Sequence, residues 1–132
     1  MMNNRRNFIK MLVAFPLAGL FRKESWAMPG NRHCVLNRFY IAGFKYYRGP
    51  ELLKTIEQGQ ELILVAEPAN PHDHFAVEIL CKGEKTGYVP RTDNRHLSRL
   101  IRQGASLKCR AVEVNPENDP GDMVKVEVQL VA

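Results

Sequence analysis

The residues best suited to chemistry lie in one short stretch of the chain, Glu67-Pro68-Ala69-Asn70-Pro71-His72-Asp73-His74-Phe75-Ala76-Val77. It places the carboxylate of Asp73 between the imidazoles of His72 and His74. Such groups can hold a metal ion, move protons or bind a polar ligand. Neighbouring side chains on an extended chain point to opposite sides, so these three do not easily converge on one ion or substrate. A metal-dependent hydrolase is therefore the weakest alternative, and we expect a binding site without a metal or other cofactor, not an enzyme.

The same stretch is typical of a rigid corner between two strands. Apolar runs at 62–66 and 75–80 flank it, and Pro68 and Pro71 fix their own φ and favour extended geometry before them. Asn-Pro and Pro-x-Asp are also common in plain turns, where Asn and Asp bond the local backbone. A plain turn and a functional loop both stay open on these residues alone, although rigid polar loops often carry binding sites.

The elements that must position this corner are short. Hydrophobic periodicity predicts strands near 34–42, 61–67, 75–81, 85–90, 106–114 and 123–131, and helices at 50–56 and 94–103. Val35, Phe39 and Ile41 mark the apolar side of the first strand, and Thr92 or Asp93 can cap the second helix. The pattern predicts a mainly β fold, a small antiparallel β-barrel of about six strands with two short helices, because closure removes exposed edges.

The second predicted helix carries Arg95, Arg99 and Arg102 at spacings that place them on one face. A solvated helix face is the simple interpretation of such a stripe. Leu97, Leu100 and Ile101 form the expected buried face. The pattern does not show whether the arginines face the corner.

The chain has three cysteines, Cys34, Cys81 and Cys109, so at least one thiol is unpaired or pairs between chains. Each lies in an apolar, strand-like context, which predicts buried thiols, and one disulfide stays possible. The spacing of Cys and His residues does not match a structural zinc site.

The N-terminus has the layout of an export signal. A basic segment with Arg5-Arg6 precedes the apolar run 11–21 and Ser25-Trp26-Ala27, and resembles the twin-arginine signal peptide of bacteria. We expect a signal peptide at 1–27, a linker at 28–33 and a folded domain at 34–132. The protein is then periplasmic or exported if the leader functions, and cytoplasmic otherwise. The apolar run is too short for a stable membrane span.

Net charge gives little information about a partner. The whole chain has a formal charge of +5, but removing residues 1–27 takes away five of the 19 basic and one of the 14 acidic residues. The remainder has a net charge of +1, so an electrostatic argument has to be local.

Three segments resemble the HIRAN domain in their order and spacing: Ala42-Gly43-Phe44-Lys45-Tyr46-Tyr47-Arg48-Gly49, the corner 67–77, and Gly87-Tyr88-Val89-Pro90. The resemblance extends over about residues 35–131. It implies an OB-like β-barrel that binds DNA, in particular the free 3′-hydroxyl end of a single strand. Larger members carry helicase and RING zinc-finger domains; this sequence has no Walker A motif and no RING cysteine set, so neither ATP hydrolysis nor zinc is implied.

The resemblance also implies roles for individual residues. Tyr46 matches the aromatic residue that contacts a base, and Lys45 and Arg91 match positions that face phosphates. Asp73 matches the acid that accepts a hydrogen bond from the terminal hydroxyl, and its charge would repel a terminal phosphate. Stacking of a base on a tyrosine is worth about 1–3 kcal/mol.

Further expectations concern the corner and the tyrosine pair. Asn70 belongs to the corner motif, and His72 stands where the family has a tyrosine. Backbone N–H groups around His72 and Asp73 are candidates to hold the last internucleotide phosphate, and Tyr88 is expected near the pocket. Strand alternation predicts that one residue of the pair Tyr46-Tyr47 lies in the core.

An exported β-barrel that binds a protein or another ligand, without a DNA role, is the alternative, because one fold hosts many functions. The sequence does not indicate an oligomeric state.

Overall fold

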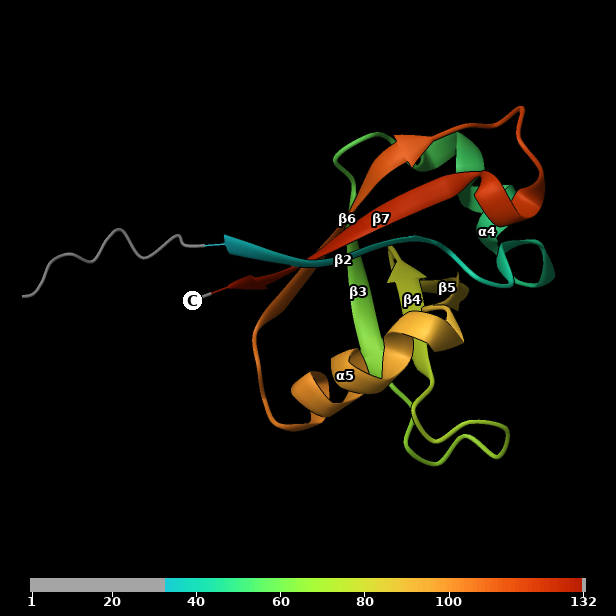
Figure 1. The fold of residues 1–132 in the computed structure, drawn as a ribbon. Coiled ribbons are helices and arrows are strands. Elements are labelled where there is room, and N and C mark those ends of the chain that lie inside the picture. Colours follow the sequence, from blue (N-terminus) through green and yellow to red (C-terminus); the bar gives the residue numbers. More distant parts are fainter. Residues whose placement is uncertain (1–32, 132) are drawn as a thin grey trace, which may run out of the picture. The chain divides into compact units, whose positions relative to one another are not determined.

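We describe residues 33–131 of a computed structural model of the 132-residue chain (Figure 1). The expected signal peptide at 1–27, and the expected linker except for His33, lie outside the described residues. Within the described range, no helix has the length and apolar character needed to cross a membrane.

Six antiparallel strands form one sheet in the order β2-β7-β6-β3-β4-β5. Their bounds are β2 His33–Tyr40, β3 Glu61–Ala66, β4 Val77–Cys81, β5 Glu84–Tyr88, β6 Leu107–Val114 and β7 Val124–Val131. The helical segments are η2 Phe44–Tyr46, α4 Gly49–Leu52, η3 Leu53–Thr55, α5 Arg91–Arg102 and η4 Pro120–Asp122. The prediction of a mainly β, OB-like fold with six strands and two short α-helices is confirmed.

The two edges of the sheet meet at one point. Ala42, just after β2, and Tyr88, at the end of β5, form an isolated bridge with N–H···O distances of 2.8 and 2.9 Å. Gly87 permits this approach, because its φ is 153° and a Cβ there would lie 2.4 Å from the Ala42 carbonyl oxygen. The predicted closure is therefore reduced to this bridge, while the edges separate elsewhere.

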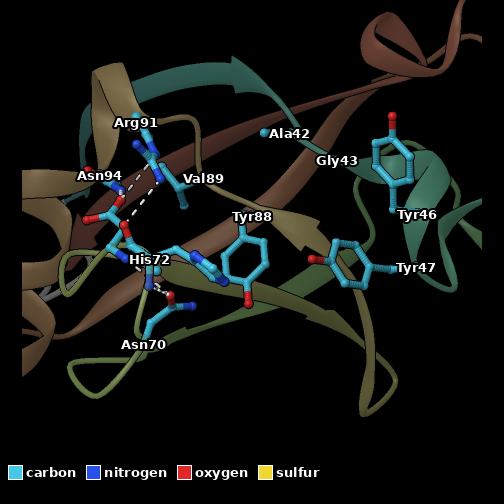
Figure 2. A pocket seen from close by; sticks show the side chains of 12 residues that line it. Ala42, Gly43, Tyr46, Tyr47, Asn70, His72, Tyr88, Val89, Arg91 and Asn94 are labelled. Atoms are coloured by element: carbon cyan, nitrogen blue, oxygen red, sulfur yellow. Dashed lines mark hydrogen bonds and ion pairs between the residues drawn. The ribbon is translucent and has the colours of Figure 1, made fainter.

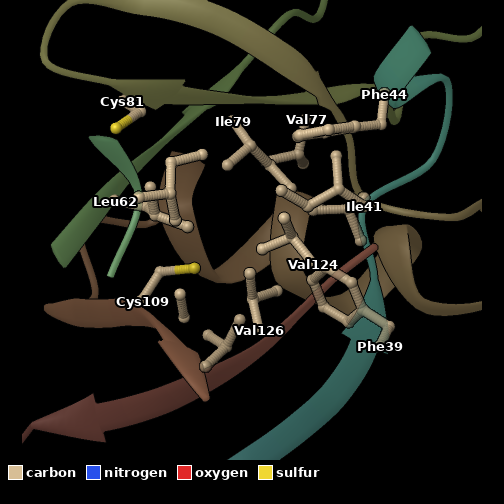
Figure 3. Close-up of a cluster of buried hydrophobic side chains, with 14 of the residues drawn as sticks. Phe39, Ile41, Phe44, Leu62, Val77, Ile79, Cys81, Cys109, Val124 and Val126 are labelled. Atoms are coloured by element: carbon tan, nitrogen blue, oxygen red, sulfur yellow. The ribbon is translucent and has the colours of Figure 1, made fainter. Parts of the chain in front are cut away.

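The core lies inside the curved sheet (Figure 3). It takes apolar side chains from five of the six strands and from α5. Phe39 and Ile41 are buried as predicted, whereas Val35 is exposed. The β2–β7 register shifts between Val35 and Asn37, and such a bulge interrupts the alternation of faces along a strand. The predicted apolar side of the first strand is therefore wrong at Val35.

The three cysteines are free thiols, and no disulfide joins them. Cys81 and Cys109 are buried as predicted, and burial raises the pKa of the Cys109 thiol to about 12. Cys34 is exposed near the start of β2, an edge strand, so the prediction of a buried thiol is wrong there.

Helix α5 begins at Arg91, three residues before the predicted start, with Pro90 as N-cap and no side-chain cap. Asp93 is not the cap, because its carboxylate accepts hydrogen bonds from Asn37 at 2.9 Å and from Thr92 at 3.0 Å. Of the predicted buried face, Leu97 is fully buried while Leu100 and Ile101 are partly buried. The early start places Arg91 in the first turn of the helix, beside the corner.

Candidate functional site

A pocket of about 380 Å³ lies where the sheet edges meet, between the corner, η2 and the start of α5 (Figure 2). Its lining residues come from four separate parts of the chain: Ala42, Gly43, Tyr46, Tyr47, Asn70, His72, Asp73, Ala76, Tyr88, Val89, Arg91 and Asn94. Six of the seven site residues expected from the sequence are therefore together, namely Tyr46, Asn70, His72, Asp73, Tyr88 and Arg91. Lys45 is the one that does not line the pocket.

Asp73 is fixed by donors on both carboxylate oxygens. Oδ1 accepts from the Phe75 N–H at 2.9 Å, and Oδ2 accepts from the Asn94 side chain at 2.8 Å. The Phe75 amide, the Asn94 amide and the positive charge of Arg91 hold the pKa of Asp73 below its ordinary value. An ionised carboxylate offers about four acceptor sites, so Asp73 can still accept a hydrogen bond from a ligand.

The side chain of Asn70 forms hydrogen bonds within the corner. Its side-chain oxygen accepts from the N–H groups of His72 at 2.8 Å and Asp73 at 3.2 Å, and its amide nitrogen donates to Glu67 at 3.0 Å. The expectation that these two N–H groups bind a phosphate is therefore wrong, because Asn70 already occupies both. These hydrogen bonds confirm the plain-turn interpretation, and the same turn forms part of the pocket wall. That the loop is functional stays a prediction.

Arg91 joins the helix to the corner. Its Nη2 donates to the His72 carbonyl at 3.3 Å, and its Nε lies 3.7 Å from Asp73 Oδ2. The Arg91 side chain is nevertheless 74% exposed, and a guanidinium carries five N–H donors. Arg91 can therefore keep these contacts and still bind an anion in the pocket.

The opposite end of the pocket is aromatic (Figure 2). Tyr46 and Tyr47 are 75% and 39% exposed, so the prediction that one of them lies in the core is wrong. The segment forms a 3-10 turn after Gly43, which has a left-handed φ of 70°, and strand alternation does not apply to it. Phe44 is the residue of this turn that is buried. Lys45 stands beside this end, with its Nζ 5.1 Å from the centre of the Tyr46 ring.

The Tyr88 ring lies between the two ends (Figure 2), and its hydroxyl is hydrogen-bonded to side chains that do not line the pocket. It donates to Glu67 at 2.8 Å and accepts from Lys85 at 2.5 Å, and its ring contacts that of Tyr47 edge-on at 5.8 Å. Burial and the charge of Glu67 raise the pKa of Tyr88. The hydroxyl therefore positions the ring, and the ring is what Tyr88 offers to a ligand.

Glu67 and Lys85, which do not line the pocket, contact the tyrosines that do. Burial opposes ionisation of Glu67, but hydrogen bonds from Asn70 and Tyr88 and the charge of Lys85 outweigh it and lower its pKa. Lys85 Nζ lies 4.6 Å from the Tyr47 ring and 4.3 Å from the Tyr88 ring. Both tyrosines are thus oriented by a cation that does not line the pocket.

Sequence reasoning missed Tyr47 and Asn94 as pocket residues. Asn94 lies three residues after Arg91, so a helix begun at Arg91 would have predicted that both face the corner. Tyr47 could be found by treating the glycine-bracketed segment as a turn in place of a strand.

Metal-ligand geometry does not occur among residues 33–131, since no three His, Cys, Asp or Glu side chains converge there. His96 instead forms a 2.7 Å hydrogen bond with the side-chain oxygen of Asn37.

Comparison with models of known families shows the family of this chain. The HIRAN domain model matches residues 36–131, most of the described part of the chain. The chain belongs to the HIRAN domain family. Domains of this family generally bind nucleic acid, so a HIRAN pocket is first a candidate nucleic-acid site.

Solved structures support the fold of this HIRAN domain. A protein from Lactobacillus plantarum superimposes with a TM-score of 0.67 at 20% identity, covering 76% of this chain and 97% of the other. The HIRAN domain of human HLTF gives a TM-score of 0.58 at 15% identity, covering 78% and 81%. No curated protein matches the chain.

Proposed function

We propose that this HIRAN domain binds the 3′-hydroxyl end of single-stranded DNA in the pocket. The observation that carries the proposal is that one pocket combines a fixed carboxylate, a cation and exposed aromatic rings: Asp73, Arg91, and Tyr46 with Tyr47. Its volume of about 380 Å³ lies within the usual range of about 300–1,000 Å³ for small-ligand sites.

End selectivity comes from Asp73. A carboxylate with acceptor capacity left can bind a terminal hydroxyl, and its negative charge repels a terminal phosphate. An ordinary aspartate is already ionised at neutral pH, and the lowered pKa of Asp73 extends its ionised range to more acidic solution. Hydrogen bonds that involve a charged partner contribute about 1.5–3 kcal/mol, which is enough to set a preference between two ends.

The other groups provide affinity. Arg91 neutralises a phosphate near the terminal nucleotide, and Lys45 does the same at the aromatic end of the pocket. Tyr46 offers a flat surface for a base, a contact that tolerates any sequence because every base has a π-face. The donors Arg91 and Lys45 take over the phosphate contact from the N–H groups that Asn70 occupies.

The test is a fluorescence anisotropy titration of the full chain with labelled oligonucleotides that differ only at the 3′ end. We expect a 3′-hydroxyl strand to bind at least about tenfold more tightly than the same strand with a 3′-phosphate, given the energy of a charge-assisted hydrogen bond. Equal affinity for both ends would remove the end-binding proposal, and no binding of either would remove a DNA role for the pocket. Binding of a protein or another ligand is the alternative in that case.

A further inference from the structure

Three arginines on α5 gather around one phenylalanine from the corner. The guanidinium carbons of Arg95, Arg99 and Arg102 lie 4.7, 5.4 and 5.8 Å from the centre of the Phe75 ring. All three side chains are exposed, while Phe75 is half-buried. We call this set the arginine stripe.

The stripe has no acidic partner in the described part of the chain. Within residues 33–131, none of its three arginines forms an ion pair, whereas Arg38, Arg48 and Arg110 do. The described residues carry 13 basic and 13 acidic residues, so this concentration of charge is local. Three like charges around one ring repel each other, and an anion supplied from outside would relieve that repulsion.

Arg91, which lines the pocket, lies on the same face of α5 as the arginine stripe. At about 100° per residue, Arg91, Arg95, Arg99 and Arg102 fall within an arc of about 80° on one face of α5. The helix has 12 residues and measures about 18 Å at 1.5 Å per residue. A stacked strand has one phosphate per about 3.4 Å, so the helix parallels about five phosphates.

Phe75 connects the stripe to the pocket. Its backbone N–H donates to Asp73 at 2.9 Å, and the ring from the same residue lies under the three guanidiniums. The corner that fixes the carboxylate in the pocket therefore also fixes the surface on which the arginines stack.

We propose that the arginine stripe binds the phosphates of the strand that leads away from the end held in the pocket. This rests on the proposed function, and adds that the ligand is a strand of several nucleotides running along α5. A membrane surface fits less well, because an interfacial helix needs large exposed apolar side chains. The exposed large hydrophobics of residues 33–131 are Val35, Tyr46, Tyr47, Ile63 and Val65, all outside α5.

The test compares a trinucleotide with a twelve-nucleotide strand, both ending in a 3′-hydroxyl, on the full chain. We expect the wild type to bind the longer strand more tightly. The triple variant R95Q/R99Q/R102Q should lose about tenfold or more for the longer strand and keep its trinucleotide affinity. Its plot of log affinity against log salt should also be shallower by about 2, at about 0.7 per lost phosphate contact to a single strand.

Two further variants serve as controls. K54Q/K82Q/K108Q removes the same charge from exposed lysines that lie outside α5 and should change the twelve-nucleotide affinity little. R95K/R99K/R102K keeps the charge and should keep most of the salt dependence, which guards against a folding defect in the glutamine variant. Thermal unfolding of all three checks that they are folded.

An undiminished twelve-nucleotide affinity in R95Q/R99Q/R102Q would overturn the proposal. An equal loss of that affinity in K54Q/K82Q/K108Q would overturn it as well. The proposal would also be overturned if R95Q/R99Q/R102Q lost binding to phosphatidylserine vesicles while it bound DNA as the wild type does. If the proposed function of the pocket is wrong, the result is different. The trinucleotide would then not bind the wild type, while binding of the longer strand would still depend on the arginines.

Discussion

The pocket and the arginine stripe lie on adjacent surfaces, but they differ in whether their charged groups have charged or hydrogen-bonding partners within the protein. In the pocket, Asp73 and Arg91 each have protein partners, and the corner is held by hydrogen bonds through Asn70. In the stripe, three guanidiniums share one ring, and residues 33–131 supply no acid for them. Fixed groups can discriminate between ligand ends, whereas exposed charges bind any phosphate, so we assign specificity to the pocket and affinity to the stripe.

The largest expected effect comes from the aromatic end of the pocket. Tyr46→Ala removes the most exposed ring, and because stacking is worth about 1–3 kcal/mol per base, affinity should fall about tenfold to hundredfold. Anisotropy with the trinucleotide measures it. The matched control is Tyr40→Ala, whose ring lies under Lys125 at 5.6 Å and does not line the pocket. A similar loss in both variants would mean that Tyr46 has no special contact.

The next effect tests specificity directly. Asp73→Asn keeps the size of the side chain but removes its charge, so the preference for a 3′-hydroxyl over a 3′-phosphate should fall by about tenfold. Competition between the two strands measures this ratio. Asp93→Asn removes the same charge from the first turn of α5 without touching the pocket and should leave the ratio unchanged. A reduced ratio in both would point to net charge, not to the Asp73 contact.

A smaller effect concerns the scaffold of the pocket. Asn70→Ala leaves the N–H groups of His72 and Asp73 without their protein acceptor, and because water can reach them it should cost about 0.5–1.5 kcal/mol of unfolding free energy. Because about 1 kcal/mol shifts the melting temperature by roughly 4–8 °C in a domain of this size, calorimetry can detect the loss. Asn118→Ala, which loses one exposed hydrogen bond to Asp122, should change little. An unchanged melting temperature for Asn70→Ala would show that the corner does not depend on it.

The smallest effect is on the pH dependence of stability. The pKa of Asp73 is lowered in the folded state, so its contribution is present at neutral pH and is lost as pH falls through that depressed pKa, below the ordinary Asp value of about 3.9. The melting temperature of Asp73→Asn should therefore fall less steeply below about pH 4 than that of the wild type. Parallel curves would contradict the role of Asp73 in holding the corner.

The sequence predicted the strands well because their apolar alternation is local information. Of the seven site residues that it predicted through the resemblance to a known family, six line the pocket, which has twelve lining residues. What it missed depends on the backbone: the bulge that exposes Val35, the turn that exposes both Tyr46 and Tyr47, and the start of α5 at Arg91. The contact of the arginine stripe with Phe75 joins a helix face to a loop, and periodicity carries no information about such a pair.

The most direct test of the central claim is an NMR measurement of the full chain bound to a trinucleotide with a 3′-hydroxyl. The account predicts intermolecular nuclear Overhauser effects from the H3′ proton of the terminal sugar to the Asp73 side chain, and from a base to the Tyr46 or Tyr47 ring. Contacts of the terminal sugar with any other surface, with the amide signals of Asp73 and Arg91 unmoved, would contradict it.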